Sequence, residues 1–142
     1  MDEMKEYDDF AKRMEEQYPA MFVGAYGGFA VGKGWWHIIE TLCSNIQHHI
    51  DWANRKEQVV EQVVVAQIKE KFGGLRFYYD GGDDQIHGMV RMAEAWADMS
   101  CEDCGAPGKR RGGGWVRTLC DVHEAERNAR IEEQERKYGL EL

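Results

Sequence analysis

Hydrophobic residues recur along this chain with two different periods. Apolar side chains three or four positions apart, the spacing of one helix face, predict helices over residues 2–18, 35–54, 84–99 and 121–138. In the third of these helices, Met89 is interpreted as a core side chain, as is Met92 one turn later, because methionine fills irregular gaps. The last helix is dense in charge and has a thin apolar face. The stripe of the second helix consists of Trp35, Ile39, Leu42, Ile46 and Ile50.

Residues 59–80 fit two different structures. Their first half has an apolar residue at every fourth position, as a helix would, but it also alternates and is rich in β-branched residues. Because Gly73-Gly74 suits a two-residue hairpin turn, we favour a β-hairpin in which Phe72 pairs with Leu75. The polar face of that hairpin would carry Lys69, Lys71, Arg76 and Tyr78.

These elements predict an α+β fold. Helices packed on a small β-hairpin or sheet, with the hairpin over residues 63–80, would form a core from residues 1–100. In residues 101–142, the spacing Cys-x2-Cys followed by Cys-x2-His is typical of a zinc site, so this part would form a treble-clef-like zinc element that leads into the charged helix. Since 142 residues suffice for one domain, we expect the two parts to form one compact unit.

Three of the four cysteines lie near a histidine in a pattern typical of a metal site. A Cys-x2-Cys turn brings two sulfurs together on a tetrahedral ion, and a three-residue spacing at a helix start places a second ligand pair on one side. We expect structural Zn²⁺, because the protein fills all four positions and leaves none for a catalytic water. The remaining Cys43 is interpreted as a buried core residue. The predicted ligands are Cys101, Cys104, Cys120 and His123.

The charge of the chain limits its partners. The net charge is −8, with acidic residues concentrated near both ends. Nucleic acid is therefore a less favoured partner, since non-specific affinity for it comes mostly from neutralising phosphates. No apolar run approaches the roughly 20 residues of a membrane span. The acidic N-terminal stretch is unlike a signal peptide, so we expect no membrane association and a location in the cytoplasm.

Two local groups of basic residues are candidates for binding an anion. The loop between the zinc ligand pairs places arginines around Trp115. This loop is either a solvent-exposed hairpin turn without a ligand or a basic binding surface. In the second case the Trp115 ring would stack on a base while the arginines pair with a phosphate. The polar face of the hairpin is the second group. The candidate ligand-binding residues are Lys33, Lys69, Lys71, Arg76, Tyr78, Arg110, Arg111 and Trp115.

Lys33 belongs to GGFAVGKG, which nearly matches the phosphate-binding pattern G-x4-G-K-[ST]. Gly34 stands where Ser or Thr would reach magnesium, so we do not expect nucleotide hydrolysis. Gly32, Lys33 and Gly34 at a helix N-terminus could still bind a phosphate. No Ser–His–Asp group or paired carboxylates stand out, so the sequence does not indicate an enzyme.

Three segments carry a resemblance to a known family. YGGFAVGKGWWHIIETLCSNIQHHI, QIKEKFGGLRFYYDGGDD and CEDCGAPG followed by GGGWVRTLCDVH resemble small zinc-binding proteins of tailed phages and prophages, over roughly residues 18–125. The resemblance implies phage origin, the host cytoplasm and bound zinc, and carries no catalytic residue over to this chain. Small phage accessory proteins often act by binding. We therefore expect a non-enzymatic counter-defence or host-takeover protein that sequesters a nucleotide-type signal or inhibits a host or defence protein.

Two other functions remain open from the sequence. CEDCG followed by a second ligand pair near a helix also looks like the finger of small transcription factors that bind RNA polymerase, although their long coiled coil is absent here. The alternative is thus a nucleic-acid-binding or RNA-polymerase-modulating zinc protein. A metal-dependent hydrolase or nuclease is less favoured. A homo-oligomer is compatible with each of these functions.

Overall fold

The computed structural model describes residues 2–24 and 26–139 of the chain. Their α+β architecture, ending in a Cys3His cluster and a final helix, confirms the predicted fold class. The outermost residues of the two predicted parts, 1 and 140–142, lie outside the described residues. In chain order the elements are α1 (Glu3–Gln17), β1 (Phe29–Ala30), a 3-10 turn (Lys33–Trp35), α2 (Trp36–Arg55), β2 (Val64–Lys71), β3 (Gly74–Asp80), α3 (Asp84–Ala97), β4 (Lys109–Arg111), β5 (Arg117–Leu119) and α4 (Asp121–Tyr138).

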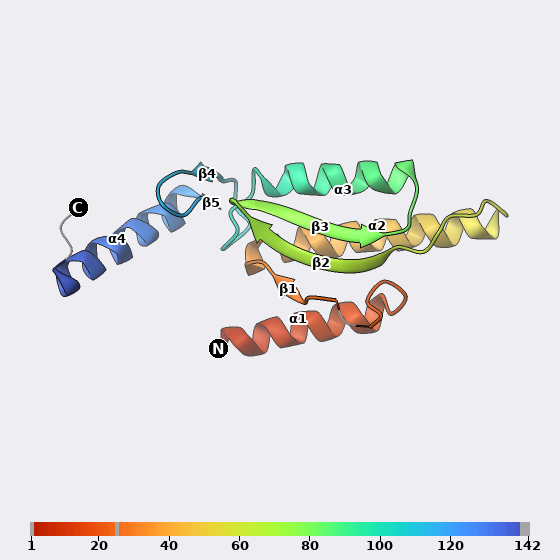
Figure 1. The fold of residues 1–142 in the computed structure, drawn as a ribbon, viewed down its shortest axis with the longest axis horizontal. Coiled ribbons are helices and arrows are strands. Elements are labelled where there is room, and N and C mark those ends of the chain that lie inside the picture. Colours follow the sequence, from red (N-terminus) through yellow and green to blue (C-terminus); the bar gives the residue numbers. More distant parts are fainter. Residues whose placement is uncertain (1, 25, 140–142) are drawn as a thin grey trace.

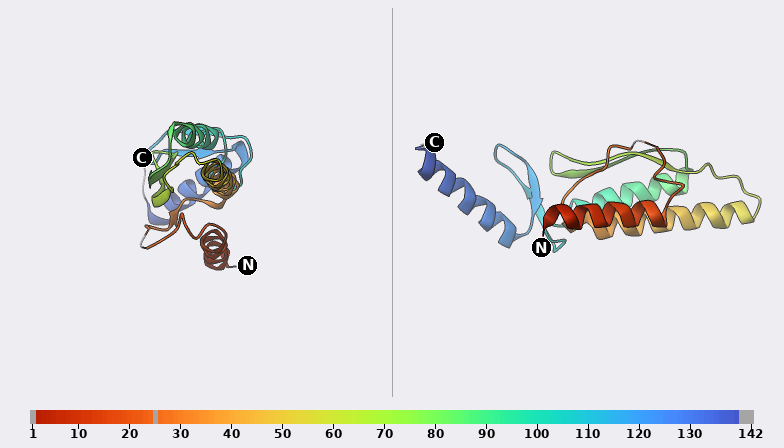
Figure 2. Two further views of the ribbon diagram at one scale, coloured as in Figure 1. Left: turned by 90° about the vertical axis from the view of Figure 1, so that its right-hand side faces the viewer. Right: turned by 90° about the horizontal axis from the view of Figure 1, so that it is seen from below.

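A small sheet and three helices form the main body of the molecule. β1 pairs with β2 in parallel, and β2 pairs with β3 in antiparallel fashion, so that β2 is the central strand. α2 and α3 contact each other on one side of the β2–β3 hairpin, and α1 lies beside β1 (Figures 1 and 2). No helix among the described residues covers the other face of the hairpin, which is the face toward the viewer in Figure 1.

The apolar stripes of the predicted helices meet in a single core. Trp35, Ile39, Leu42, Ile46 and Ile50 of the second stripe are all buried. In the same core Cys43 is fully buried, and burial raises the pKa of its thiol, so it packs as a neutral apolar group. No helix in the described part of the chain is both long enough and apolar enough to cross a membrane.

The predicted hairpin is confirmed, but its predicted register is wrong. Phe72 and Gly73 are the central turn residues, with φ of 53° and 80°, and Lys71 pairs with Gly74. Glu70 thus lies opposite Leu75. Positive φ at both central residues is typical of a type I′ turn. Phe72 therefore leaves the core face and is 69% exposed.

One distant side chain and one neighbouring side chain form hydrogen bonds with this turn. The Gly73 carbonyl accepts a 2.7 Å hydrogen bond from the Thr118 hydroxyl of β5, and the Gly73 N–H donates to the Glu70 carboxylate at 2.7 Å. Moving the turn by one residue shifts each pairing partner by two positions. Because side chains alternate with period two, residues 68–71 and 75–79 keep their predicted core and solvent faces. A register shift between Val65 and Gln67 interrupts the alternation farther along β2, so Val65 and Ile68 are both buried.

Two interpretations of α3 also need correction. The helix ends at Ala97 rather than at residue 99. Met92 is 70% exposed instead of lying in the core. The buried residues of α3 are Ile86, Val90, Ala93 and Ala97. Met92 follows Val90 by two positions, or about 200° around the helix, so it lies off the buried stripe of α3.

Candidate metal centre and anion-binding residues

Local structure brings the four predicted metal ligands together. After the first ligand pair, Gly105 adopts a φ of 82° and its N–H donates to the Cys101 carbonyl at 2.8 Å, which closes the knuckle. β4 and β5 then pair in antiparallel fashion and return the chain to Cys120. Cys120 is the N-cap of α4, and its sulfur accepts a hydrogen bond from the His123 N–H. Knuckle, hairpin and helix form a treble-clef arrangement.

The distances between the donor atoms fit one tetrahedral ion. The Cys104 and Cys120 sulfurs are 3.8 Å apart, and His123 Nδ1 lies 3.6 Å from Cys101 Sγ and 3.2 Å from Cys120 Sγ. All four donor atoms lie within 4.8 Å of one another. Tetrahedral bonds of the lengths that zinc forms would separate two sulfurs by about 3.8 Å and sulfur from nitrogen by about 3.5 Å. The four residues can therefore hold a metal ion.

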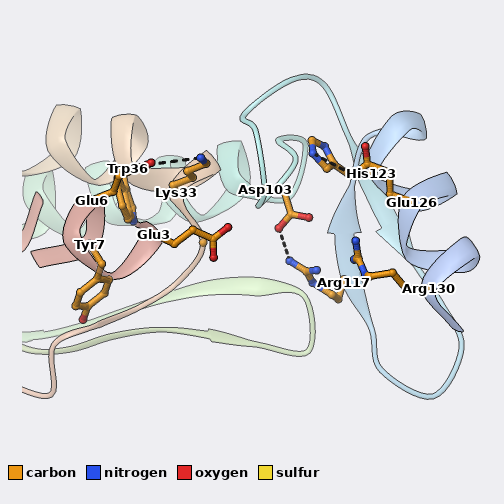
Figure 3. A pocket seen from close by; sticks show the side chains of 11 residues that line it. Glu3, Glu6, Tyr7, Lys33, Trp36, Asp103, Arg117, His123, Glu126 and Arg130 are labelled. Carbon is orange, nitrogen blue, oxygen red and sulfur yellow. Dashed lines mark hydrogen bonds and ion pairs between the residues drawn. The ribbon is translucent and has the colours of Figure 1, made fainter. Parts of the chain in front are cut away.

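The start of α4 favours the metal-binding form of its ligands. The pKa of Cys120 is lowered to about 7, first because the His123 N–H donates to its sulfur. His123 offers Nδ1 to the cluster, while its Nε2 faces the Glu126 carboxylate at 3.9 Å (Figure 3). A carboxylate on the outer nitrogen fixes the ring orientation of a metal-bound histidine. Cys101 and Cys120 are buried, whereas Cys104 is exposed.

The knuckle is joined to the main body through the glycine-rich segment before α2. The Gly34 N–H donates to the Glu102 carbonyl at 2.7 Å, and the Gly32 N–H donates to the Glu102 carboxylate at 2.9 Å. The Trp35 indole N–H donates to the Ser100 carbonyl at 2.9 Å. The Gly32 and Gly34 N–H groups that a phosphate would need are thus occupied by the carboxylate and the backbone carbonyl of Glu102. Glu102 was not singled out by the sequence, because its position within Cys-x2-Cys carries no signal of its partners.

A cleft separates the start of α1 and α2 from the metal element (Figure 3). It has a volume of about 530 Å³. Lys33 on its wall lies 3.6 Å from the Glu6 carboxylate, and Arg117 lies 2.7 Å from Asp103. Four acidic and three basic side chains line the cleft, so it does not concentrate positive charge. Its lining includes none of the other predicted anion-binding residues, so Lys33 lies apart from them.

The arginines of the β4–β5 hairpin differ in how strongly they are paired. Arg111 has a side chain only 14% exposed and contacts Asp121, Glu124 and the Leu119 carbonyl. It therefore holds the hairpin to the first turn of α4. Arg110 makes one ion pair, to Asp98 after α3, at 2.5 Å. Trp115 at the loop tip is 70% exposed, and its carbonyl accepts a hydrogen bond from Arg127.

The solvent face of the β2–β3 hairpin carries the other predicted cations. Lys69 lies directly opposite Arg76, and its ammonium is 5.7 Å from the centre of the Tyr78 ring. Within the described residues neither cation forms an ion pair with an acidic side chain. Lys71 contacts the exposed ring of Phe72 at 5.7 Å.

The two hairpins meet above Gly74. A Cβ added at Gly74 would lie 3.1 Å from Arg76 Nη1 and 3.3 Å from Arg110 Nη2, with Asp98 Oδ1 at 3.5 Å. The structure thus brings Arg76 and Arg110 together from different elements, and it leaves Lys33 and Arg111 elsewhere. Comparisons of the chain with protein-family models, with curated proteins and with solved structures gave no match.

Proposed function

We propose that this protein is a zinc-stapled, non-enzymatic phage accessory protein that captures a nucleotide-type anion in host takeover or counter-defence. Its ligand would lie where the outer face of the β2–β3 hairpin meets the β4–β5 hairpin. The metal is Zn²⁺ because three thiolates and one imidazole form a soft donor set that suits tetrahedral zinc. With four protein ligands the ion has a structural role, holding the hairpin that carries Arg110 and Trp115.

One observation carries the proposal, namely the like-charged pair Lys69 and Arg76. Like charges directly opposite each other on neighbouring strands destabilise a sheet. Here they are cross-strand partners, and Arg110 lies beside Arg76 above Gly74, where it pairs with Asp98. A bound anion would relieve this repulsion. In a chain of net charge −8, such a concentration of cations favours a specific ligand over general attraction to polyanions.

Two exposed aromatic rings favour a nucleotide over a simple phosphate. Phe72 and Trp115 are 69% and 70% exposed. Phe72 is next to Gly73 in the chain, and Trp115 is next to Val116. Gly73 and Val116 lie close together across the two hairpins, because a Cβ added at Gly73 would be 3.3 Å from the Val116 side chain. Aromatic side chains beside arginines stack bases while the cations pair with phosphates.

Titration calorimetry with a panel of ligands tests this function. The panel consists of a nucleoside triphosphate, a cyclic dinucleotide, a short single-stranded oligonucleotide and inorganic phosphate. Arg76→Gln or Lys69→Gln should weaken binding of the best nucleotide about tenfold, because each removes a charged hydrogen bond. Neither change should lower the unfolding temperature, since each relieves the repulsion. Arg55→Gln, on an exposed residue at the end of α2, is the matched control.

The proposal fails if no nucleotide binds, or if both variants bind as tightly as the unchanged protein. Preference for the oligonucleotide, with a steep dependence on salt, would instead support the nucleic-acid-binding alternative. A native mass spectrum separately tests the metal. It should show one zinc ion per chain, which disappears in the Cys104→Ser, Cys120→Ser double variant.

A further inference from the structure

Solvent can reach one of the three cysteine ligands. Cys104 is exposed, whereas Cys101 and Cys120 are only 0% and 8% exposed. Cys104 also lines a cavity of about 530 Å³, whose wall includes Lys33 and Asp103. A small solute can therefore reach this ligand while the fold stays intact. A cysteine that binds a metal does so as the thiolate, which is also the form that reacts with oxidants.

A second cysteine lies within reach of Cys104. The sulfurs of Cys104 and Cys120 are 3.8 Å apart, and a disulfide requires them to approach to about 2 Å. Both belong to the same set of four metal ligands. A bond between them would therefore remove two of the four ligands at once, and the remaining two could not hold the ion.

The fourth cysteine of the chain is protected from the same reaction. Cys43 is fully buried in the core of the main body, which is separate from the small cluster around the metal ligands. Burial raises the pKa of its thiol, so Cys43 stays protonated and unreactive. It provides an internal control for the chemistry at the metal centre.

The metal ligands are joined to the proposed anion site through β5. Thr118, two positions before Cys120, is fully buried, and its hydroxyl donates to the Gly73 carbonyl at 2.7 Å. In the β4–β5 pair Thr118 lies opposite Arg110, the β4 arginine that reaches Gly74. The buried cluster of this hairpin consists largely of metal ligands. Loss of the metal should therefore release Arg110 from the site.

We propose that Cys104 and Cys120 form an oxidation site at which an oxidant of the peroxide class releases the metal and dismantles the anion site. The Cys104 thiolate attacks one peroxide oxygen, the O–O bond breaks and hydroxide leaves, which gives a sulfenic acid. The Cys120 thiolate attacks that sulfur and displaces a second hydroxide, so that the disulfide forms. Each thiolate loses one electron and the peroxide gains two, while two protons from solvent convert the hydroxides to water.

Hydrogen peroxide added to the full zinc-loaded chain tests this site. A zinc indicator dye follows the released metal, and mass spectrometry of peptides identifies the joined cysteines. One zinc ion should be released for each disulfide between Cys104 and Cys120, and a thiol reductant with added zinc should reverse both changes. Cys104→His, which keeps four donors without the exposed thiolate, should slow the release about tenfold or more. Cys43→Ala is the matched control and should release zinc as fast as the unchanged protein.

Zinc that stays bound under peroxide would overturn the proposal, as would a disulfide through Cys43 or Cys101. If Cys104→His does not bind zinc, the disulfide mapped in the unchanged chain decides.

The control of ligand binding rests on the proposed function, whereas the oxidation does not. Oxidised protein should bind the nucleoside triphosphate or cyclic dinucleotide about tenfold more weakly, because Arg110 is no longer held in the site. Oxidised protein that binds as tightly as before would overturn this control. If the untreated protein binds no nucleotide, the proposed function fails, and the zinc and disulfide measurements still decide whether the oxidation site exists.

Discussion

Gly34 shows how a single missing side chain joins two distant segments. A Cβ at this position would lie 2.2 Å from the Cys101 carbonyl oxygen and 2.6 Å from the Glu102 carbonyl oxygen. Both are backbone atoms of the metal knuckle, and backbone atoms cannot swing aside as the end of a flexible side chain can. The glycine next to Lys33 thus provides close backbone contact, where the sequence pattern had indicated a phosphate loop.

Gly34→Ala should therefore destabilise the protein by about 2 kcal/mol or more and weaken metal binding. The added methyl group forces the Cys101 peptide away from its position and disturbs one ligand of the ion. Thermal unfolding and a competition titration with a zinc chelator measure the two effects. Gly88→Ala is the control. Its methyl group meets no atom within 4 Å, so it should stabilise α3 by about 0.5–1 kcal/mol. Equal stability of the two variants would contradict this account.

Asp83 is a second residue whose side chain links two elements. As the N-cap of α3, it accepts a 3.0 Å hydrogen bond from the Ile86 N–H, and its other oxygen lies 2.8 Å from His49 Nε2 on α2. The bond to His49 is the main cause that lowers the pKa of Asp83 below its ordinary value of 3.8, and the Ile86 N–H adds to it.

A lowered pKa in the folded state means that Asp83 stabilises the fold above pH 3.8 and loses this effect as the pH falls through the folded value. Asp83→Ala should cost about 1 kcal/mol at pH 6. The difference from the unchanged protein should be fully present above pH 3.8 and shrink as the pH falls below that value. Denaturant unfolding at each pH measures it, with Asp84→Ala as the control. A difference that does not shrink as the pH is lowered would assign the effect to something other than the charge of Asp83.

At the scale of elements, the metal knuckle and its hairpin have little core of their own. Their buried apolar cluster consists of Cys101, Leu119 and Cys120, with Ala106 packed against it. The main body has a separate and much larger cluster. A small element with so few buried apolar side chains needs another source of stability, which a bound metal ion can supply. The folding of β4 and β5 should therefore depend on the ion.

Removal of the metal should therefore unfold the C-terminal element and spare most of the body. After treatment with a chelator, amide hydrogens of residues 101–120 should lose their protection from exchange. Those of α2 and β2 should remain protected, because their core does not include the ligands. Added zinc should restore the protection. Simultaneous loss of protection in both parts would show that they fold as one cooperative unit, as the chain length had suggested.

At the scale of the whole molecule, α4 extends away from the body (Figures 1 and 2). It has no buried residue along its length. Its attachment lies in its first two turns, where Cys120 caps the helix, His123 joins the metal cluster and Arg127 donates to the Trp115 carbonyl. The second half carries charged side chains into solvent, in keeping with the thin apolar face expected from the sequence.

A chain that ends at Asn128 should keep its fold and its metal. Loss of the second half of α4 should cost less than about 1 kcal/mol, as is usual for exposed residues away from the core. The unfolding temperature and the zinc content by mass spectrometry are the measurements. A truncation at Asp121 removes His123 and should abolish metal binding, which serves as the positive control. Insolubility of the longer truncated chain would reveal a packing role for the end of α4.

The sequence by itself determined those features of the structure that depend on residues close together in the chain. Apolar side chains such as Ile39 and Ile46 share one helix face because they lie seven positions apart, and Cys101 and Cys104 converge because their turn is short. The helices, the existence of the hairpin and the ligand cluster could thus be predicted. The strand faces next to the turn could be predicted as well, since side chains alternate over residues 68–71 and 75–79. The register shift between Val65 and Gln67, by which Val65 and Ile68 both lie in the core, could not.

Only the tertiary structure decided what depends on segments far apart in the chain. The hairpin turn at Gly73 is bonded to Thr118 of β5, and the glycine loop meets Glu102 seventy positions away. Arginines that look alike in the sequence have different surroundings in the structure. Arg111 forms an ion pair with Asp121 of α4, whereas Arg76 lies above Gly74 and has no acidic partner among the described side chains. Periodicity cannot distinguish these cases, because the partner of a charged or apolar side chain is set by which elements lie beside it in space.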